Sequence, residues 1–410
     1  MRVAVAAVLL FLAVPSSADV PVVKLFPVTN TNDDGSGSLR AAIETVNASC
    51  DGTVICRITF QIPGPGPWHT IRPARPLPQL LAPNLQIDGE SQKTTGGDTN
   101  ALGPEIELNG SLVEEGNGLD LRGSCYPTVI GLAINGFPSN GILLGGHSCG
   151  SGVSGTIAAN YIGCDPTGSR AVPNARGIWV DSPRALHYNN RIERNVISGN
   201  RYSGIFVGSG PQLIHSNVIG LTATLDGPLP NGASGVAVLE KGSGTDVNEN
   251  VIGFNHHFGI GLERGTTTVG IEGNSFQGNR QLAIDYGMDG VSPHGVISIP
   301  EITNARYENG DTIVEIRVNE SLGTFPRIYV YANDAPDPSG YGEGQYFLGL
   351  TGSSSSSDRQ FTFRHAGDLR GKWVTATAMQ VHYYGWLRTN GERQGFATTS
   401  SEFSRAVEVK

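Results

Sequence analysis

Two short phrases recur along the middle of this chain, and their recurrence constrains the fold more than any other feature. The first phrase resembles Asn-Val-Ile-Gly, and its copies begin at Asn160, Asn195, Asn217, Asn250 and Asn274. The second resembles Gly-Ile-x-Val, and its copies begin at Gly177, Gly204, Gly235, Gly259 and Ala283. The spacing of the asparagines is 22 residues between 195 and 217 and 24 between 250 and 274. Repeats of this length are typical of solenoids, in which each repeat is one structural unit.

Each phrase has the pattern of a short β-strand, with β-branched residues in alternation and Gly or Asn at the turns. One such unit cannot bury its apolar face, whereas stacked copies can, because every backbone group then pairs with the coil above and below. The sequence therefore predicts an all-β protein with a right-handed parallel β-helix over residues 24–298. An asparagine at one fixed turn of every coil predicts a hydrogen-bonded ladder along the stack.

The ends of the predicted solenoid differ from its middle. Residues 38–48, SLRAAIETVNA, place Leu39, Ile43 and Val46 on one helical face after the potential N-cap Ser38. This pattern predicts an amphipathic helix that covers the first coil. From residue 300 to 410, strand-like stretches alternate with long turns, which predicts a C-terminal β-sandwich of the Ig-like kind.

Several blocks carry a family resemblance. VTNTNDDGSGSLRAAIETVNA is similar to the N-terminal region of bacterial secreted proteins named for a Cys-Ser-Leu-Arg-Glu-Ala motif, with Gly37 and Ala41 in place of the Cys and Glu. NYIGCDPTG, ANDAPDPSGYGEGQYFLG and TSSEFS extend the resemblance over most of the chain. It implies a right-handed parallel β-helix but no set of catalytic residues. Relatives usually carry a Cys before DPSGYGEG and another after SEFS, where this chain has Pro336 and Arg405-Ala406, which implies a disulfide lost as a pair.

The first residues have the pattern of a secretory signal. An apolar run from Val3 to Val14 follows Arg2, and small residues at Ser16 and Ala18 match a signal-peptidase site. We expect residues 1–18 to be removed and the protein to be secreted or held at the cell envelope, with no membrane span. The net charge of −9 without a basic run argues against nucleic acid as a partner.

The five cysteines fit an exported protein. Cys50 and Cys56 are close enough to staple a loop after the capping helix. Cys125 and Cys149 lie at nearly equivalent places in successive coils, so a disulfide between coils is expected, although Cys149 could pair with Cys164 instead. No CxxC spacing accompanies these cysteines, and neither a metal site nor a cofactor is expected.

The outward face of the second phrase supplies candidate functional residues. Ile178, Val180 and their equivalents point inward, so Trp179 and Phe206 point outward, where their rings could stack on sugars. With Arg264 they form the candidate glycan-binding set. The candidate catalytic carboxylates are Glu263 and Asp285, because paired carboxylates on neighbouring coils are what glycosidic cleavage requires. Asp181, another outward acid of the second phrase, is the third candidate. Chance neighbours on an exposed solenoid face explain the same pattern without catalysis.

The edge formed by two long loops is a second candidate location for function, besides the outward face of the second phrase. His256-His257 and the pair Glu193 and His215 have the pattern of solvated surface residues. The insertions 164–174 and 221–231 lengthen the same turn in alternate coils. Loops on one edge of a solenoid often form its binding surface, and the alternative is that these two only lengthen the turn.

The sequence thus favours an exported protein that binds a glycan or a partner surface, with polysaccharide or a cell-surface glycan as the expected partner. A polysaccharide lyase or glycoside hydrolase, and a structural envelope protein, are the alternatives.

Overall fold

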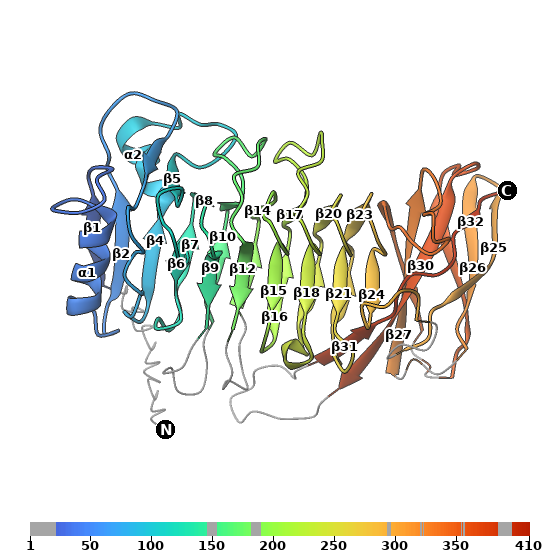
Figure 1. Ribbon diagram of the computed structural model, residues 1–410. Coiled ribbons are helices and arrows are strands. Elements are labelled where there is room, and N and C mark those ends of the chain that lie inside the picture. The colour runs from blue at the N-terminus through green and yellow to red at the C-terminus, as the bar shows by residue number, and fades with distance from the viewer. Residues whose placement is uncertain are drawn as a thin grey trace, which may run out of the picture.

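A computed structural model describes residues 22–145, 154–181, 190–292, 297–319, 322, 324–353, 355, 357–383 and 396–410. Its first part is a right-handed parallel β-helix, and its last part is a pair of antiparallel sheets at the end of that helix (Figure 1). The predicted fold class is therefore confirmed.

Three parallel sheets, named A, B and C here, form the faces of the solenoid. Sheet A contains β1 (Val23–Val28), β2 (Ile55–Phe60), β4 (Leu85–Asp88), β7 (Thr128–Ile130), β10 (Thr156–Ala158), β13 (Asn190–Glu193), β16 (Gln212–His215), β19 (Asp246–Asn248) and β22 (Gly270–Glu272). Sheet B contains β3 (His69–Ile71), β5 (Ile106–Asn109), β8 (Leu132–Asn135), β11 (Tyr161–Ile162), β14 (Val196–Ile197), β17 (Val218–Ile219), β20 (Val251–Gly253) and β23 (Ser275–Gln277). Sheet C contains β6 (Leu119–Asp120), β9 (Asn140–Leu144), β12 (Arg176–Val180), β15 (Ile205–Val207), β18 (Val236–Val238), β21 (Ile260–Leu262) and β24 (Ile284–Tyr286).

The register follows the repeated phrases. Ile178 pairs with Ile205, and Val180 with Val207, so equivalent residues of successive coils stack. These four side chains are buried in the core, as the alternation predicts. The first and second phrases of the sequence are thus the strands of sheets B and C.

The predicted asparagine ladder exists at the corner between sheets A and B. Asn195 Nδ2 donates to Asn217 Oδ1 at 2.9 Å, and Asn217 repeats the contact to Asn250 at 2.9 Å. A second ladder, which we did not predict, runs along the corner between sheets B and C through Asn174, Asn200, Asn231, Asn255 and Asn279. In four of its five members the asparagine stands four residues before the second phrase, so the sequence contained a signal for it.

The N-terminal coil is covered by α1 (Leu39–Ser49), and the Ser38 side chain accepts a hydrogen bond from the Ala41 backbone N–H at 3.2 Å. Leu39, Ile43 and Val46 are buried against the coil. Both the capping helix and its N-cap are therefore confirmed. A second, one-turn helix, α2 (Lys93–Gly96), lies on the surface.

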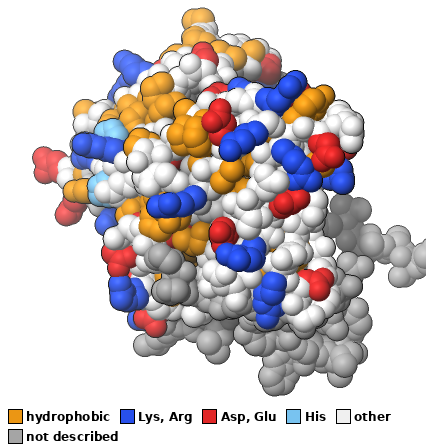
Figure 2. Space-filling view, turned by 90° about the vertical axis from the view of Figure 1, so that its right-hand side faces the viewer, with side chains coloured by type: hydrophobic (Ala, Val, Ile, Leu, Met, Phe, Trp, Pro, Cys, Tyr) orange, Lys and Arg blue, Asp and Glu red, His pale blue; other side chains and the backbone are white. Residues whose placement is uncertain are grey.

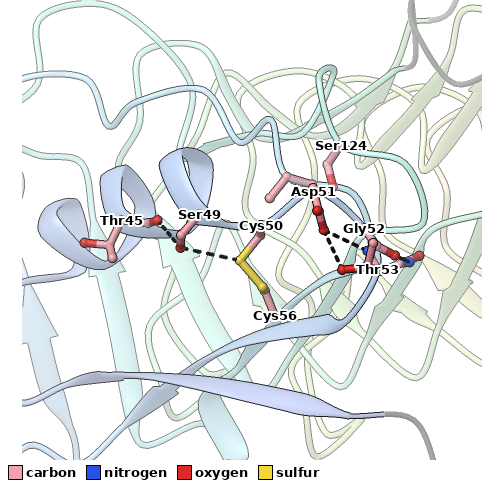
Figure 3. The surroundings of a disulfide bond; sticks show 10 residues. Thr45, Ser49, Cys50, Asp51, Gly52, Thr53, Cys56 and Ser124 are labelled. Carbon is pink, nitrogen blue, oxygen red and sulfur yellow. Dashed lines mark hydrogen bonds between the residues drawn. A yellow bond between two sulfur atoms is a disulfide. The ribbon is translucent and has the colours of Figure 1, made fainter.

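A disulfide joins Cys50 at the end of α1 to Cys56 in β2, with their Cα atoms 6.4 Å apart (Figure 3). Cys125 is also disulfide-bonded, while its expected partner Cys149 lies outside the described residues. Cys164 is a buried free thiol, which differs from the alternative pairing of Cys149 with Cys164.

Two antiparallel sheets follow the solenoid. One contains β25 (Glu301–Glu308), β26 (Asp311–Arg317) and β29 (Gln360–Ala366). The other contains β27 (Thr324–Asn333), β28 (Tyr346–Gly352), β30 (Trp373–Tyr383), β31 (Phe396–Ser400) and β32 (Val407–Glu408). Buried residues such as Val314, Val330 and Ala376 lie in their shared core, which is the arrangement of a β-sandwich.

The sandwich covers the C-terminal end of the solenoid (Figure 1). Phe403 packs edge-on against Phe276 of β23 and Tyr331 of β27, with ring centroids 5.6 and 5.1 Å apart. The apolar core of the solenoid therefore continues into this domain. Seen from this end, the described face carries cationic and anionic side chains in alternation rather than a patch of one sign (Figure 2).

Candidate functional site

The outer face of sheet C carries an aromatic platform, defined here as Arg176, Trp179, Tyr202 and Phe206. Trp179 and Phe206 are register partners on β12 and β15, and their rings meet edge-on with centroids 6.0 Å apart. The Arg176 guanidinium lies 5.1 Å from both ring centroids and 5.6 Å from that of Tyr202, which is 56% exposed. The two predicted aromatic residues are thus together, and Arg176 and Tyr202 join them.

The predicted carboxylates Glu263 and Asp285 have different surroundings. Glu263 is exposed, and its carboxylate accepts a hydrogen bond from the Glu240 backbone N–H at 2.9 Å, toward the preceding coil. Asp285 is fully buried and accepts from the backbone N–H groups of Asp289 and Gly290 at 3.1 and 2.9 Å. Burial raises the pKa of Asp285. The expectation of a free outward carboxylate at 285 is therefore wrong, because the turn after β24 folds over this side chain.

The remaining predicted site residues have separate surroundings. Arg264 forms an ion pair with Asp289 in that turn, so its charge is already matched. Asp181 is half-buried directly after β12, where its backbone N–H donates to the Leu144 carbonyl at 2.8 Å. Neither residue contacts the aromatic platform in any described interaction.

A cleft of about 910 Å³ lies between the last coils and the sandwich, and we call it the junction cleft. One wall consists of turns that flank β21 and β24, and the other is the segment 333–345 between β27 and β28. This second wall contains most of the DAPDPSGYGEG block. The volume is within the range of ordinary ligand pockets, which is roughly 300–1,000 Å³.

The solenoid wall of the cleft is partly apolar. Its apolar members are Phe254, Phe258, Leu282 and Met288. A Cβ atom at Gly261 of β21 would lie 3.0 Å from Phe258 and 3.1 Å from Met288, so the glycine at this position leaves room for both side chains. Phe258 and Met288 therefore cover the outer face of sheet C beyond the aromatic platform.

Polar groups surround this apolar surface. The Arg280 side chain is exposed, and none of the ion pairs among the described residues includes it. Asp334 pairs with Lys372 at 2.5 Å, while Asp337 accepts a hydrogen bond from the Ser339 backbone N–H at 2.8 Å. Gln277 and Gln281 add amide groups to the lining. The Arg280 guanidinium and the half-buried Asp337 carboxylate thus have no ion-pair partner among the described residues.

Glu343 joins the two walls of the cleft. Its carboxylate oxygens accept hydrogen bonds from the backbone N–H groups of Gly278 and Asn279 at 2.7 and 3.1 Å. Burial raises the pKa of Glu343 to about 7, although the two N–H donors act in the opposite direction. The residue belongs to the GYGEG block, which the sequence singled out only by resemblance.

The other predicted surface groups are found on other faces. His256 and His257 are exposed in the turn between β20 and β21. The Glu193 carboxylate contacts His215 at 2.6 Å and Arg191 at 2.6 Å on the outer face of sheet A. Partial burial is the largest single effect on Glu193 and would raise its pKa. The hydrogen bonds and ion pairs with these neighbours together outweigh it, so the pKa of Glu193 is lowered.

The two insertions pack against one another. The Ala223 backbone N–H donates to the Gly168 carbonyl at 3.0 Å. Cys164 and Leu229 from these insertions enclose a small apolar cluster with Val196 on sheet B. At least part of this edge is therefore committed to packing on the solenoid.

The described residues contain no group of three or more His, Cys, Asp or Glu side chains that could hold a metal ion. Among the helices in the described part of the chain, none is long and apolar enough to cross a bilayer.

Comparison with models of protein families supports the solenoid. A family model described as the right handed beta helix region matches residues 117–294. No curated protein matches the sequence. The enzymatically active domain of tailspike protein 2 from bacteriophage CBA120 is 8% identical, with 91% of this chain and 76% of that chain covered and a TM-score of 0.32. The full-length tailspike protein 2 of an Escherichia coli O157:H7 bacteriophage is 9% identical, with 91% and 68% covered and a TM-score of 0.22. The family model and the strand register agree that residues 117–294 form a right-handed parallel β-helix.

Proposed function

We propose that this chain is an extracellular glycan-binding protein whose ligand occupies the junction cleft. The observation that carries this proposal is the cleft itself, in which phenylalanines and Met288 line one side while Arg280, Asp337 and glutamine amides line the others. Sugars have apolar faces that pack on aromatic rings and hydroxyls that bond to planar polar side chains. A cleft with both kinds of surface suits such a ligand.

The aromatic platform extends the same face. It belongs to β12 and β15, whereas the cleft adjoins β21 and β24, so both lie along the outer side of sheet C. From β12 to β24 there are four strand spacings, or about 19 Å. A glycan long enough to span them would stack on Trp179 and Phe206 and end in the cleft. The binding roles predicted for these two residues thus form part of the proposal.

The proposal also includes export of the protein and its membership of a narrower group of β-helix proteins. The apolar run before residue 18 supports removal of a signal peptide and a location outside the cell or in its envelope. The SLRAA, DPSGYGEG and SEFS blocks support membership of the Cys-Ser-Leu-Arg-Glu-Ala group of secreted β-helix proteins. A carbohydrate ligand fits an exported protein with an open solenoid face.

A polysaccharide panel tests the proposal by calorimetry. We expect one glycan to bind wild type, and we expect Arg280→Ala to weaken that binding by about tenfold, as loss of one charged contact should. Arg72→Ala removes another exposed arginine, far along the chain from the cleft, and should bind as wild type does. A panel without any binder, or equal affinity of both variants, would contradict the proposal.

The same panel separates the two alternatives. Unsaturated products or new reducing ends would identify a lyase or hydrolase instead of a binding protein. If products form, Glu263→Gln and Asp285→Asn test the predicted carboxylates directly. Binding of no glycan, combined with recovery of the protein from an envelope fraction, would favour a structural role.

A further inference from the structure

The corner between sheets B and C carries a row of side chains beside its asparagine ladder. In Figure 1 this corner lies between the strand row β14, β17, β20, β23 and the strand row β15, β18, β21, β24. The residue after each ladder asparagine donates its backbone N–H to the carbonyl of the ladder asparagine one coil earlier. This bond measures 2.8 to 3.0 Å in the coils of Arg201, Gly232, His256 and Arg280. These four positions therefore stack in register, about 4.8 Å apart from coil to coil.

Most positions in this row carry a basic side chain. Arg201, His256 and Arg280 are exposed, and His257, which follows directly, is exposed as well. Arg176 lies one coil before Arg201, on the aromatic platform. We call these residues the basic strip: Arg176, Arg201, His256, His257 and Arg280. The strip runs from the aromatic platform to the junction cleft, because Arg176 belongs to the first and Arg280 lines the second.

The basic strip lacks carboxylate partners. None of the ion pairs between described residues includes a member of the strip. The two insertions beside it do carry carboxylates, but these are bonded within their own loops. Asp165 accepts from the Thr167 hydroxyl at 3.0 Å, and Asp226 accepts from the Thr222 hydroxyl at 2.7 Å. The cations of the strip are therefore free to bind an external anion.

This arrangement stands out because the protein as a whole is acidic. The sequence has 37 acidic and 28 basic residues, so carboxylates are in excess. Elsewhere an arginine such as Arg306 pairs with two glutamates. A row of unpaired cations on an acidic surface attracts anions locally where the rest of the protein repels them. Asp337, on the opposite wall of the cleft from Arg280, is a carboxylate that opposes this attraction.

The backbone keeps a gap open within the row. Gly232 lies between Arg201 and His256, and a Cβ atom at this glycine would lie 2.1 Å from the Arg201 carbonyl oxygen. A side chain is thus excluded there, and Arg201 and His256 are two strand spacings apart, or about 10 Å. The exposed ring of Tyr202 follows Arg201 directly. A sugar could therefore stack on this ring while its acidic group meets Arg201.

We propose that the ligand of the proposed function is an acidic polysaccharide, whose carboxylate or sulfate groups bind along the basic strip from the aromatic platform to the junction cleft. A guanidinium presents its N–H donors in a planar fork that matches either kind of oxyanion, and the neighbouring rings pack on the sugar faces. The inference rests on the proposed function and adds the chemical class of the glycan, which the cleft alone does not specify.

Polymers that differ in charge test the inference. Alginate is compared with its uncharged propylene glycol ester, and dextran sulfate with dextran, by calorimetry on the full chain. We expect wild type to bind the acidic member of at least one pair about tenfold more tightly than the neutral member, and to lose this preference in concentrated salt. The two pairs separate a carboxylate ligand from a sulfate ligand. Equal or tighter binding of the neutral member in both pairs would overturn the inference.

Two variants with the same loss of charge locate the effect. Arg201→Gln should weaken binding of the acidic polymer by about fivefold, as loss of one exposed ion pair allows. Lys241→Gln removes an exposed cation on η2 (Glu240–Gly242), at the opposite end of the sheet C strands, and should bind as wild type does. Equal affinities of the two variants would show that net charge, and not the strip, attracts the polymer.

The outcomes separate this inference from the proposed function. If a neutral glycan of the wider panel binds and neither acidic polymer does, the acidic class is wrong while the proposed function stands. If no glycan of either kind binds, both are wrong.

Discussion

The two ends of the solenoid are closed in chemically different ways. At the N-terminal end, α1 buries Leu39, Ile43 and Val46, and a disulfide ties the end of the helix to β2. At the C-terminal end, carboxylates and carbonyls of the sandwich take over the hydrogen bonds that another coil would make. Apolar contacts and a covalent bond close the first end, whereas hydrogen bonds between two domains close the second. Closure of a solenoid therefore does not require one chemistry.

One charged group is an exception at the N-terminal end. Arg40 is 1% exposed, and its guanidinium donates to Asp33 Oδ1 and to the carbonyls of Arg75 and Pro76, each at 2.8 Å. It is the arginine of the SLRAA block. An arginine keeps its charge over the whole physiological range, so this contact should not change with pH in that range.

Removal of this arginine should give the largest effect. Arg40→Ala leaves Asp33 and two carbonyl groups without their donor, and we expect the free energy of unfolding to fall by about 3 kcal/mol. Urea denaturation, monitored by circular dichroism, measures this free energy of unfolding. Arg72→Ala, at an exposed position, should stay within about 0.5 kcal/mol of wild type. Similar midpoints for the two variants would show that the N-terminal cap needs only its apolar contacts.

A substitution in the asparagine ladder between sheets A and B tests the middle of the solenoid, which lies between its two differently closed ends. Asn217→Ala removes the acceptor for both the backbone N–H and the side-chain amide of Asn195, and it leaves Asn250 Oδ1 with only the backbone N–H of residue 217 as its donor. We expect a loss of about 2 kcal/mol, measured by urea denaturation. Asn32→Ala, at an exposed position before α1, is the control and should be nearly neutral. A neutral Asn217→Ala would mean that water replaces the ladder.

Loss of the N-terminal disulfide should have an effect of about the same size. The bridge closes a loop with a sequence separation of 6, for which the chain-entropy model gives about 2 kcal/mol. The double variant Cys50→Ser with Cys56→Ser should lose this amount in a thermal or urea melt. Reductant should destabilise wild type further, because Cys125 is also in a disulfide. If reductant affects wild type no more than the double substitution does, the second bridge contributes nothing.

The smallest expected effect concerns sheet C. Trp179→Ala removes ring contacts with Phe206 and Arg176 from the outer face and leaves the stacked core intact, so we expect a loss of about 1 kcal/mol. Differential scanning calorimetry would show it as a small shift. A loss as large as that of Arg40→Ala would mean that the platform is structural and would weaken its proposed role in binding.

The repeated phrases were sufficient to predict the solenoid and one asparagine ladder. Local periodicity specifies which side chains point inward, and every coil repeats the same turn, so Ile178 and Asn217 could be placed without coordinates. The capping helix was predictable because Ser38 and three apolar residues form a local pattern. The register also paired Trp179 with Phe206.

The candidate site could not be predicted in the same way. Glu343 lies 64 residues from Asn279 along the chain, and Glu402 lies 116 from Tyr286, so no local pattern relates either glutamate to its donor. Asp285 continues the strand alternation, yet the turn that follows β24 buries it. Sequence by itself determined the coil, its inward face and its first cap, because each depends on neighbours at fixed short spacings. Only the tertiary structure decided the junction cleft and the contacts of Glu343 and Glu402 with the last coil, because these arise where a non-repeating domain docks on that coil and changes the solvation of groups that looked exposed.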